Sequence, residues 1–94
     1  MHSDPMPELF KTYNPSVFKM KRIVLGVTAT ELSSQARISR LTLLNLERGA
    51  SVSKSIVLLV GITLDKILEY KLSVISNQQE AARLKRCFEL LDSD

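Results

Sequence analysis

The sequence predicts an all-α protein, a compact bundle of five to six short helices, and three observations carry that prediction. Helix-start signals, in which a capping residue precedes a stretch of helical apolar period, recur along the chain. No segment alternates apolar and polar residues over the length of a strand, and no Asn-Gly pair marks a hairpin turn. Apolar residues make up 45% of the 94 residues, which suffices for one small, mainly aliphatic core.

Start and stop signals divide the chain into segments. Asn14-Pro15 indicates a cap followed by proline at the first helical position, and Thr28 with Glu31 forms the pattern of a capping box. Ser39 is a good cap for a third helix that ends before Gly49. The expected helices cover residues 15–25, 28–36, 39–48, 53–60 and 63–71, and 78–91. Gly61 either separates the fourth and fifth of these or lies within one bent helix.

Three regions follow from this division. All three prolines lie in the first fifteen residues, so we expect residues 1–14 to form a flexible N-terminal arm. Residues 15–72 are expected to form the main domain. Residues 73–94 are expected to carry a C-terminal helix for contact with a second copy or a partner.

Several classes of protein are excluded by what the sequence lacks. Cys87 is the single cysteine and His2 the single histidine, so neither a disulfide nor a soft-ligand metal site is expected. The sequence also offers no nucleophile–base pair, carboxylate dyad or phosphate-binding glycine loop, so we expect no enzyme and no cofactor. No apolar run approaches the length of a membrane span, and MHSDPMPELF is no secretory signal. We expect a cytoplasmic protein without membrane contact.

The net charge of +3 is unevenly distributed. Residues 11–54 hold eight Lys or Arg against two Glu, whereas residues 55–94 hold five bases against six acids. A basic front half favours a surface that binds a polyanion. The basic residues that we expect to be available for phosphates are Lys19, Lys21, Arg37, Arg48 and Lys54.

Two short helices joined by a tight turn, over residues 28–48, match the layout of a helix-turn-helix. The spacing places Leu32 and Ala36 inward on the first helix and Leu43 and Leu46 inward on the second, with Ile38 closing the angle between them. The outward face of the second helix then carries Arg40, Leu41, Leu44, Asn45 and Arg48. A helix with such a face can enter a DNA major groove, where its side chains meet base edges.

The stretch KRIVLGVTATELSSQARISRLTLLNLERG resembles the helix-turn-helix of the Xre and phage-repressor (lambda Cro-like) family. The resemblance covers about residues 20–65 and follows the family order of motifs: L-G-hydrophobic-T, E-L-S, A-x-I-S, T-L and L-E-R-G. The continuation GASVSKSIVLLV is similar to a subset of the family that includes HipB-like antitoxins of HipA-like kinase modules. The resemblance implies the compact fold of a phage-repressor DNA-binding domain.

The resemblance also implies roles for individual residues. Arg22 and Glu47 match a partly buried ion pair that links the first and third helices. Ser39 and Thr42 match positions that commonly contact phosphates or base edges, and Arg40, Leu41 and Asn45 match the base-reading positions of the third helix. The full set of DNA-binding residues that we expect consists of these five together with Thr28, Arg37, Leu44 and Arg48.

The chain departs from the family pattern at three places. Ala29 stands where a phosphate-binding Gln is common, and Arg37 stands where the turn often has a left-handed Gly. Leu41 and Leu44 stand where polar side chains usually read bases. These two leucines can meet thymine methyls, pack on another protein, or fold inward.

The back half of the chain is rich in apolar residues that allow more than one use. Those between residues 56 and 68 are either core or partly a dimer seam. The last helix carries an apolar stripe of Ala81, Leu84, Cys87, Phe88 and Leu91. This stripe either folds back on the domain or pairs with a second subunit or a partner, and we expect Cys87 to be a packed apolar residue within it.

The sequence thus favours a DNA-binding transcriptional regulator, a repressor that acts as a homodimer on an inverted-repeat operator in double-stranded DNA. The alternative is an antitoxin that binds a HipA-like kinase toxin and regulates its own promoter.

Overall fold

Polar side chains cap the described helices, with Asn14 and Ser39 at cap positions that the sequence predicts. In the computed structural model, which describes residues 14–92, Asn14 Oδ1 accepts a hydrogen bond from the backbone N–H of Ser16. Ser39 Oγ and Ser53 Oγ each accept one from the N–H three residues further on. Each cap satisfies a backbone donor that has no partner within its own helix.

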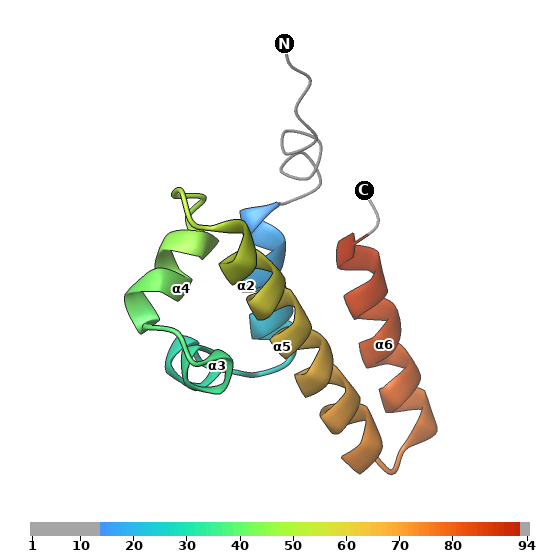
Figure 1. Cartoon of the computed structure of the whole chain (residues 1–94). Helices are drawn as coiled ribbons and strands as arrows, with labels where there is room; N and C mark the ends of the chain where they lie inside the picture. The colour runs from blue at the N-terminus through green and yellow to red at the C-terminus, as the bar shows by residue number, and fades with distance from the viewer. Residues whose placement is uncertain (1–13, 93–94) are drawn as a thin grey trace.

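The described residues form five α-helices and no strand, which confirms the all-α prediction. The helices are α2 (Pro15–Val24), α3 (Ala29–Ala36), α4 (Arg40–Glu47), α5 (Lys54–Val74) and α6 (Gln78–Asp92). Figure 1 shows α3 and α4 on one side of the molecule, the long α5 crossing it, and α6 on the far side. The predicted arm, residues 1–14, lies outside the described residues except for Asn14.

The apolar stretches 53–60 and 63–71 belong to one uninterrupted helix, so of the two alternatives at Gly61 the single helix holds and the separation into two helices does not. A glycine inside a helix costs only about 1 kcal/mol relative to alanine, which tertiary packing readily offsets. That packing is close here, because a Cβ at Gly61 would lie 3.7 Å from Phe18 Cε1 of α2. α2 and α5 therefore meet at this point.

The core lies where α2, α3, α4 and α5 converge. Leu32 and Ala36 of α3 and Leu43 and Leu46 of α4 are buried, as the sequence predicts. Ile38, in the link between α3 and α4, packs half-buried against the same cluster. The largest side chains without solvent contact are Leu32, Leu43, Leu46, Leu64 and Val60. An aliphatic core of this kind fixes the two short helices relative to the long one.

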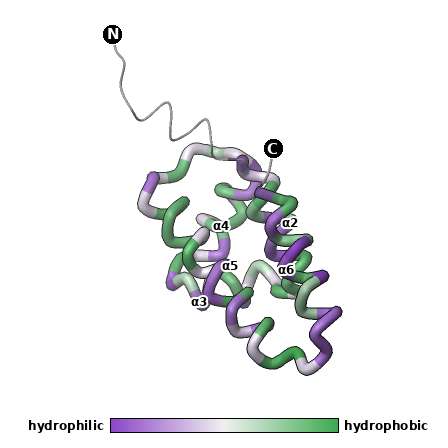
Figure 2. The backbone as a smooth tube through the Cα atoms, turned by 90° about the vertical axis from the view of Figure 1, so that its right-hand side faces the viewer, coloured by the Kyte–Doolittle hydropathy of each residue, from purple (hydrophilic) through white to green (hydrophobic). Residues whose placement is uncertain are grey.

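α6 folds back on α2 and α5, and Figure 2 shows it beside α2. Phe88 is its one buried residue among those described, 3% exposed, and it joins the main core cluster. The Nζ atom of Lys21 on α2 lies 4.8 Å from the centre of the Phe88 ring and 2.7 Å from Asp92 Oδ1. A cation over an aromatic face is attracted to it, so Lys21 fastens α6 to the domain.

Two expectations are corrected at this contact. Cys87 is exposed, because Phe88, its neighbour along α6, is the residue that points into the core. Lys21 is 9% exposed and paired with Asp92, so it is not available for phosphates. The remaining members of the predicted stripe, Ala81, Leu84 and Leu91, are half-buried.

Among residues 14–92, no helix has the length and apolar character that crossing a membrane requires.

Candidate nucleic-acid interface

The link between α3 and α4 consists of Arg37, Ile38 and Ser39. Arg37 adopts the left-handed conformation, with φ 60° and ψ 43°, and its N–H donates to the carbonyl of Ser34. The N–H of Ile38 donates to the carbonyl of Ser33. This conformation closes α3 and turns the chain into α4, but it costs an arginine about 1–2 kcal/mol that a glycine would not lose.

At the start of α4, Ser39 and Thr42 bind each other. Ser39 Oγ accepts a hydrogen bond from Thr42 N at 3.0 Å and lies 2.7 Å from Thr42 Oγ1. Ser39 is exposed and Thr42 half-buried, so the hydroxyl pair lies at the surface at the N-terminus of α4. A hydroxyl and backbone N–H groups at a helix N-terminus are suited to a phosphate oxygen.

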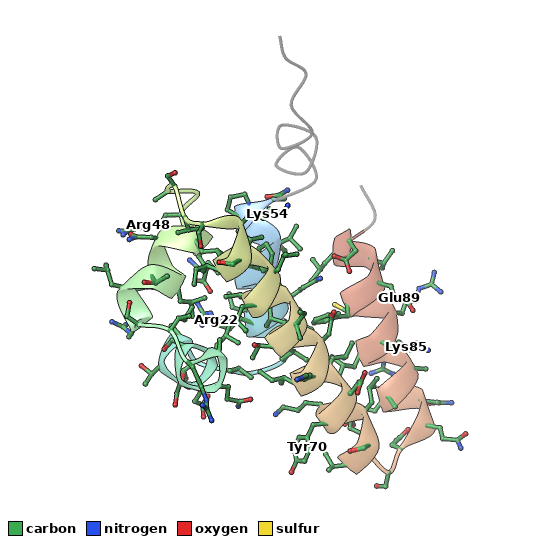
Figure 3. All side chains as sticks on the ribbon, viewed as in Figure 1. Arg22, Arg48, Lys54, Tyr70, Lys85 and Glu89 are labelled. Atoms are coloured by element: carbon green, nitrogen blue, oxygen red, sulfur yellow. The ribbon has the colours of Figure 1, made fainter. Side chains whose placement is uncertain are left out.

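The surface of α4 that faces solvent carries Arg40, Leu41, Asn45 and Arg48, and we call it the α4 face. Arg40 and Arg48 are exposed, Leu41 is 63% exposed and Asn45 is half-buried. Arg48 Nη2 donates a hydrogen bond to Asn45 Oδ1. Figure 3 shows Arg48 projecting from the end of α4 away from the rest of the molecule.

Leu44 does not belong to this outward surface. It is half-buried and packs against the core cluster, so its predicted outward orientation is wrong and the inward alternative holds. The reason is that α4 packs on both α2 and α3, which widens its buried side. Leu41, by contrast, stays in solvent.

The buried side of α4 is fixed by the ion pair between Arg22 and Glu47 that the resemblance implies. Arg22 Nε donates to Glu47 Oε2 at 2.7 Å and Arg22 Nη2 to Glu47 Oε1 at 3.0 Å. Arg22 Nη1 also donates to the carbonyl of Val27 at 3.2 Å. The side chains are 13% and 3% exposed. The hydrogen bonds to Glu47 raise the pKa of Arg22, with burial acting in the opposite direction.

The start of α3 is held by the predicted capping box. Thr28 Oγ1 accepts from the N–H of Glu31 at 3.1 Å, and the N–H of Thr28 donates to Glu31 Oε1 at 2.8 Å. The hydrogen bond from the Thr28 backbone N–H to the Glu31 carboxylate holds the pKa of Glu31 below its ordinary value, and the side chain of Thr28 acts in the same direction. Thr28 is exposed, so its side chain remains at the surface next to α3.

The charge of the α4 face is positive. Glu47 is the one acidic residue of α4 and is buried in its ion pair, so the α4 face has two arginines and no exposed carboxylate. Arg37 is exposed beside it. Figure 3 shows Lys85 and Glu89 of α6 on the opposite side from Arg48. Among residues 14–92, no three His, Cys, Asp or Glu gather as metal ligands would.

Two features of the structure were not predicted from the sequence. One is the bond between Arg48 and Asn45, for which a spacing of three residues on a helix was the available signal. The other is a cluster of exposed apolar side chains on α5, consisting of Leu58, Leu59 and Ile62, which we call the α5 patch. The apolar density of residues 56–68 allowed both a core and a dimer seam, and it did not separate these three residues from Val60 and Leu64, which are buried.

No protein-family model, no curated protein and no solved structure matches this chain.

Proposed function

We propose that the chain is a sequence-specific DNA-binding regulator of transcription, in which α3 and α4 form a helix-turn-helix and α4 enters the major groove. The observation that carries the proposal is the two-sided character of α4. One side is locked into the domain by Leu43, Leu46 and Glu47, and the other presents Arg40, Asn45 and Arg48 to solvent.

The chemistry of the α4 face fits base edges. The major groove admits an α-helix, and arginine to guanine is the commonest specific contact there. The exposed Leu41 offers an apolar surface to a thymine methyl. The donors for the phosphates on either side are Thr42 in the first turn of α4 and Ser39, Arg37 and Thr28, which precede that helix in the chain. The resemblance of residues 20–65 to the phage-repressor family supports the same docking and favours repression.

The proposal includes a homodimer, because one recognition helix reads too few base pairs for useful specificity. Two copies related by a two-fold axis place their recognition helices about 34 Å apart, which matches successive major grooves on one side of the duplex. The α5 patch is the candidate seam, since its three side chains are exposed next to one another on a helix that packs against α3. The operator is then an inverted repeat.

The experiment that tests this function is selection of binding sites from a pool of random duplexes by the purified full chain. We expect recovery of an inverted repeat, bound with an affinity that falls steeply as salt is raised, because cations on the protein displace counterions from phosphates. If the recovered duplexes share no common sequence, or if their binding to the protein does not depend on salt, the proposal is contradicted.

A second candidate function is an antitoxin that holds a kinase-like toxin subunit and regulates its own promoter. The favouring observation is the position of α6, which lies on the opposite side of the molecule from α4 (Figure 1). Leu90 of α6 is 60% exposed. A protein bound there leaves the α4 face free for DNA. Co-expression with the product of a neighbouring kinase-like gene distinguishes the antitoxin from a regulator that acts alone. For an antitoxin, Leu90→Asp should abolish the complex with that protein, and Arg40→Ala should leave it intact.

A further inference from the structure

Asn45 and Arg48 form a single hydrogen-bonded unit on the α4 face. The two residues are three positions apart, so their side chains lie on the same side of the helix. Arg48 Nη2 donates to Asn45 Oδ1, which joins the only amide of this face to a cation. Arg48 is exposed at the C-terminal cap of α4, and Asn45 is half-buried one turn before it.

This bond changes what Asn45 can read. A free asparagine offers one acceptor and one donor group, and that combination matches the N6 amino group and N7 atom of adenine. Here Oδ1 already accepts from a guanidinium. Oδ1 has a second lone pair. An adenine amino group that reached it, however, would place its partly positive N–H hydrogen close to the positive charge of Arg48, which repels it. The groups of Asn45 that remain for a base are the two N–H bonds of Nδ2.

The rest of the unit also consists of donors. Arg48 keeps the N–H groups that do not bind Asn45, and arginine has no acceptor. Arg40, the other polar side chain of the α4 face, is likewise a donor only. Guanine is the base that presents two acceptors, N7 and O6, and no donor in the major groove.

We propose that Asn45 and Arg48 act as one donor-only reading unit, and that the operator carries guanine, not adenine, at the base that faces Asn45. This inference rests on the proposed DNA-binding function and specifies its ligand. Arg48 is a positioning residue for Asn45, because it sets which groups of the amide face the base.

The test compares binding sites selected from a random duplex pool by the full-length wild type, Asn45→Ala, Arg48→Ala and Arg40→Ala. The base that faces Asn45 is the position at which Asn45→Ala loses its preference. At that position the wild type should favour guanine over adenine about tenfold. Arg48→Ala releases Oδ1, so its preference should change to adenine. Arg40→Ala, the matched control, should bind more weakly and keep guanine.

A modified base provides a readout that needs no variant. Replacing guanine at this position by 7-deazaguanine removes the N7 acceptor and should weaken wild-type binding several-fold. If the wild type prefers adenine at this position, or if Arg48→Ala still prefers guanine, this inference is wrong while the proposed function stands. A wild type that retains no duplex overturns the proposed function and this inference with it.

Discussion

Arg22 on α2 and Glu47 at the end of α4 are joined by two hydrogen bonds, of 2.7 and 3.0 Å, although 25 residues separate them in the sequence. The carboxylate is 3% exposed, so the pair is shielded from water. Because Arg22 also binds the carbonyl of Val27, one guanidinium holds α4 and the entry to α3 in a fixed relation. The orientation of the α4 face therefore depends on this pair.

Glu47→Ala should lower the free energy of unfolding by about 3 kcal/mol or more, because it leaves the half-buried guanidinium of Arg22 without a countercharge. Glu31→Ala, the matched control, removes an exposed carboxylate from the capping box and should cost clearly less. The double variant Arg22→Met/Glu47→Leu should recover much of the loss, since it removes both charges. Chemical denaturation that ranks Glu31→Ala as the more damaging single change would show that the pair does not stabilise the fold.

The capping box predicts a dependence of stability on pH. The pKa of Glu31 is lowered in the folded chain, so its charged form stabilises the fold at a pH above the ordinary pKa of glutamate. This contribution is lost as the pH falls through the lowered folded pKa. Glu31→Gln keeps an acceptor for the Thr28 N–H and loses the titration. The advantage of the wild type over Glu31→Gln should therefore shrink on acidification, and stability curves that run parallel in acid would contradict this.

Arg37→Gly should change stability and DNA binding in opposite directions. Glycine adopts the left-handed conformation at φ 60° without strain, so the fold should gain about 1 kcal/mol. Loss of a cation beside α4 should weaken duplex binding. It should also reduce, by about 1, the slope of the logarithm of the binding constant against the logarithm of the salt concentration. Arg37→Asn, which also tolerates this conformation, serves as the control for charge. Thermal melts and titrations at several salt concentrations check both parts, and unchanged binding would place Arg37 outside the interface.

Association through the α5 patch predicts that Ile62→Ser abolishes cooperative binding of two protomers to an inverted repeat. Ile62 is 53% exposed, so the change should leave the fold intact. Tyr70→Ser is the matched control, because Tyr70 is 66% exposed and lies at the far end of α5 from Lys54 (Figure 3). Light scattering of the protein–DNA complexes measures the number of protomers. If Ile62→Ser dimerises like the wild type, another surface forms the seam.

Local signals were sufficient to predict where the described helices begin. Thr28, Ser39 and Asn77 each accept hydrogen bonds from backbone N–H groups two or three residues later, an interaction that depends only on neighbouring residues. The inward positions of α3 and α4 follow from helical period for the same reason. The all-α fold could therefore be predicted from these signals.

The remaining features depend on contacts between distant parts of the chain. Lys21 is buried because Phe88 and Asp92, from the last helix, close over it, and no local pattern indicates that pairing. Cys87 and Phe88 both fit an apolar stripe, and only the packing of α6 on α2 decides that Phe88 points inward. Leu44 lies at the margin of the buried side of α4, where a small rotation of the helix decides between core and solvent.

The central claim, that the α4 face reads DNA, is tested most directly by the affinity of the selected duplex for three proteins: the wild type, Arg40→Ala and Arg83→Ala. Both arginines are exposed, but Arg40 lies on α4 and Arg83 on α6, so the two variants remove the same charge from different surfaces. We predict that Arg40→Ala weakens binding by about 1–3 kcal/mol and that Arg83→Ala binds like the wild type. Equal affinities for Arg40→Ala and the wild type, or a larger loss with Arg83→Ala, would contradict the claim.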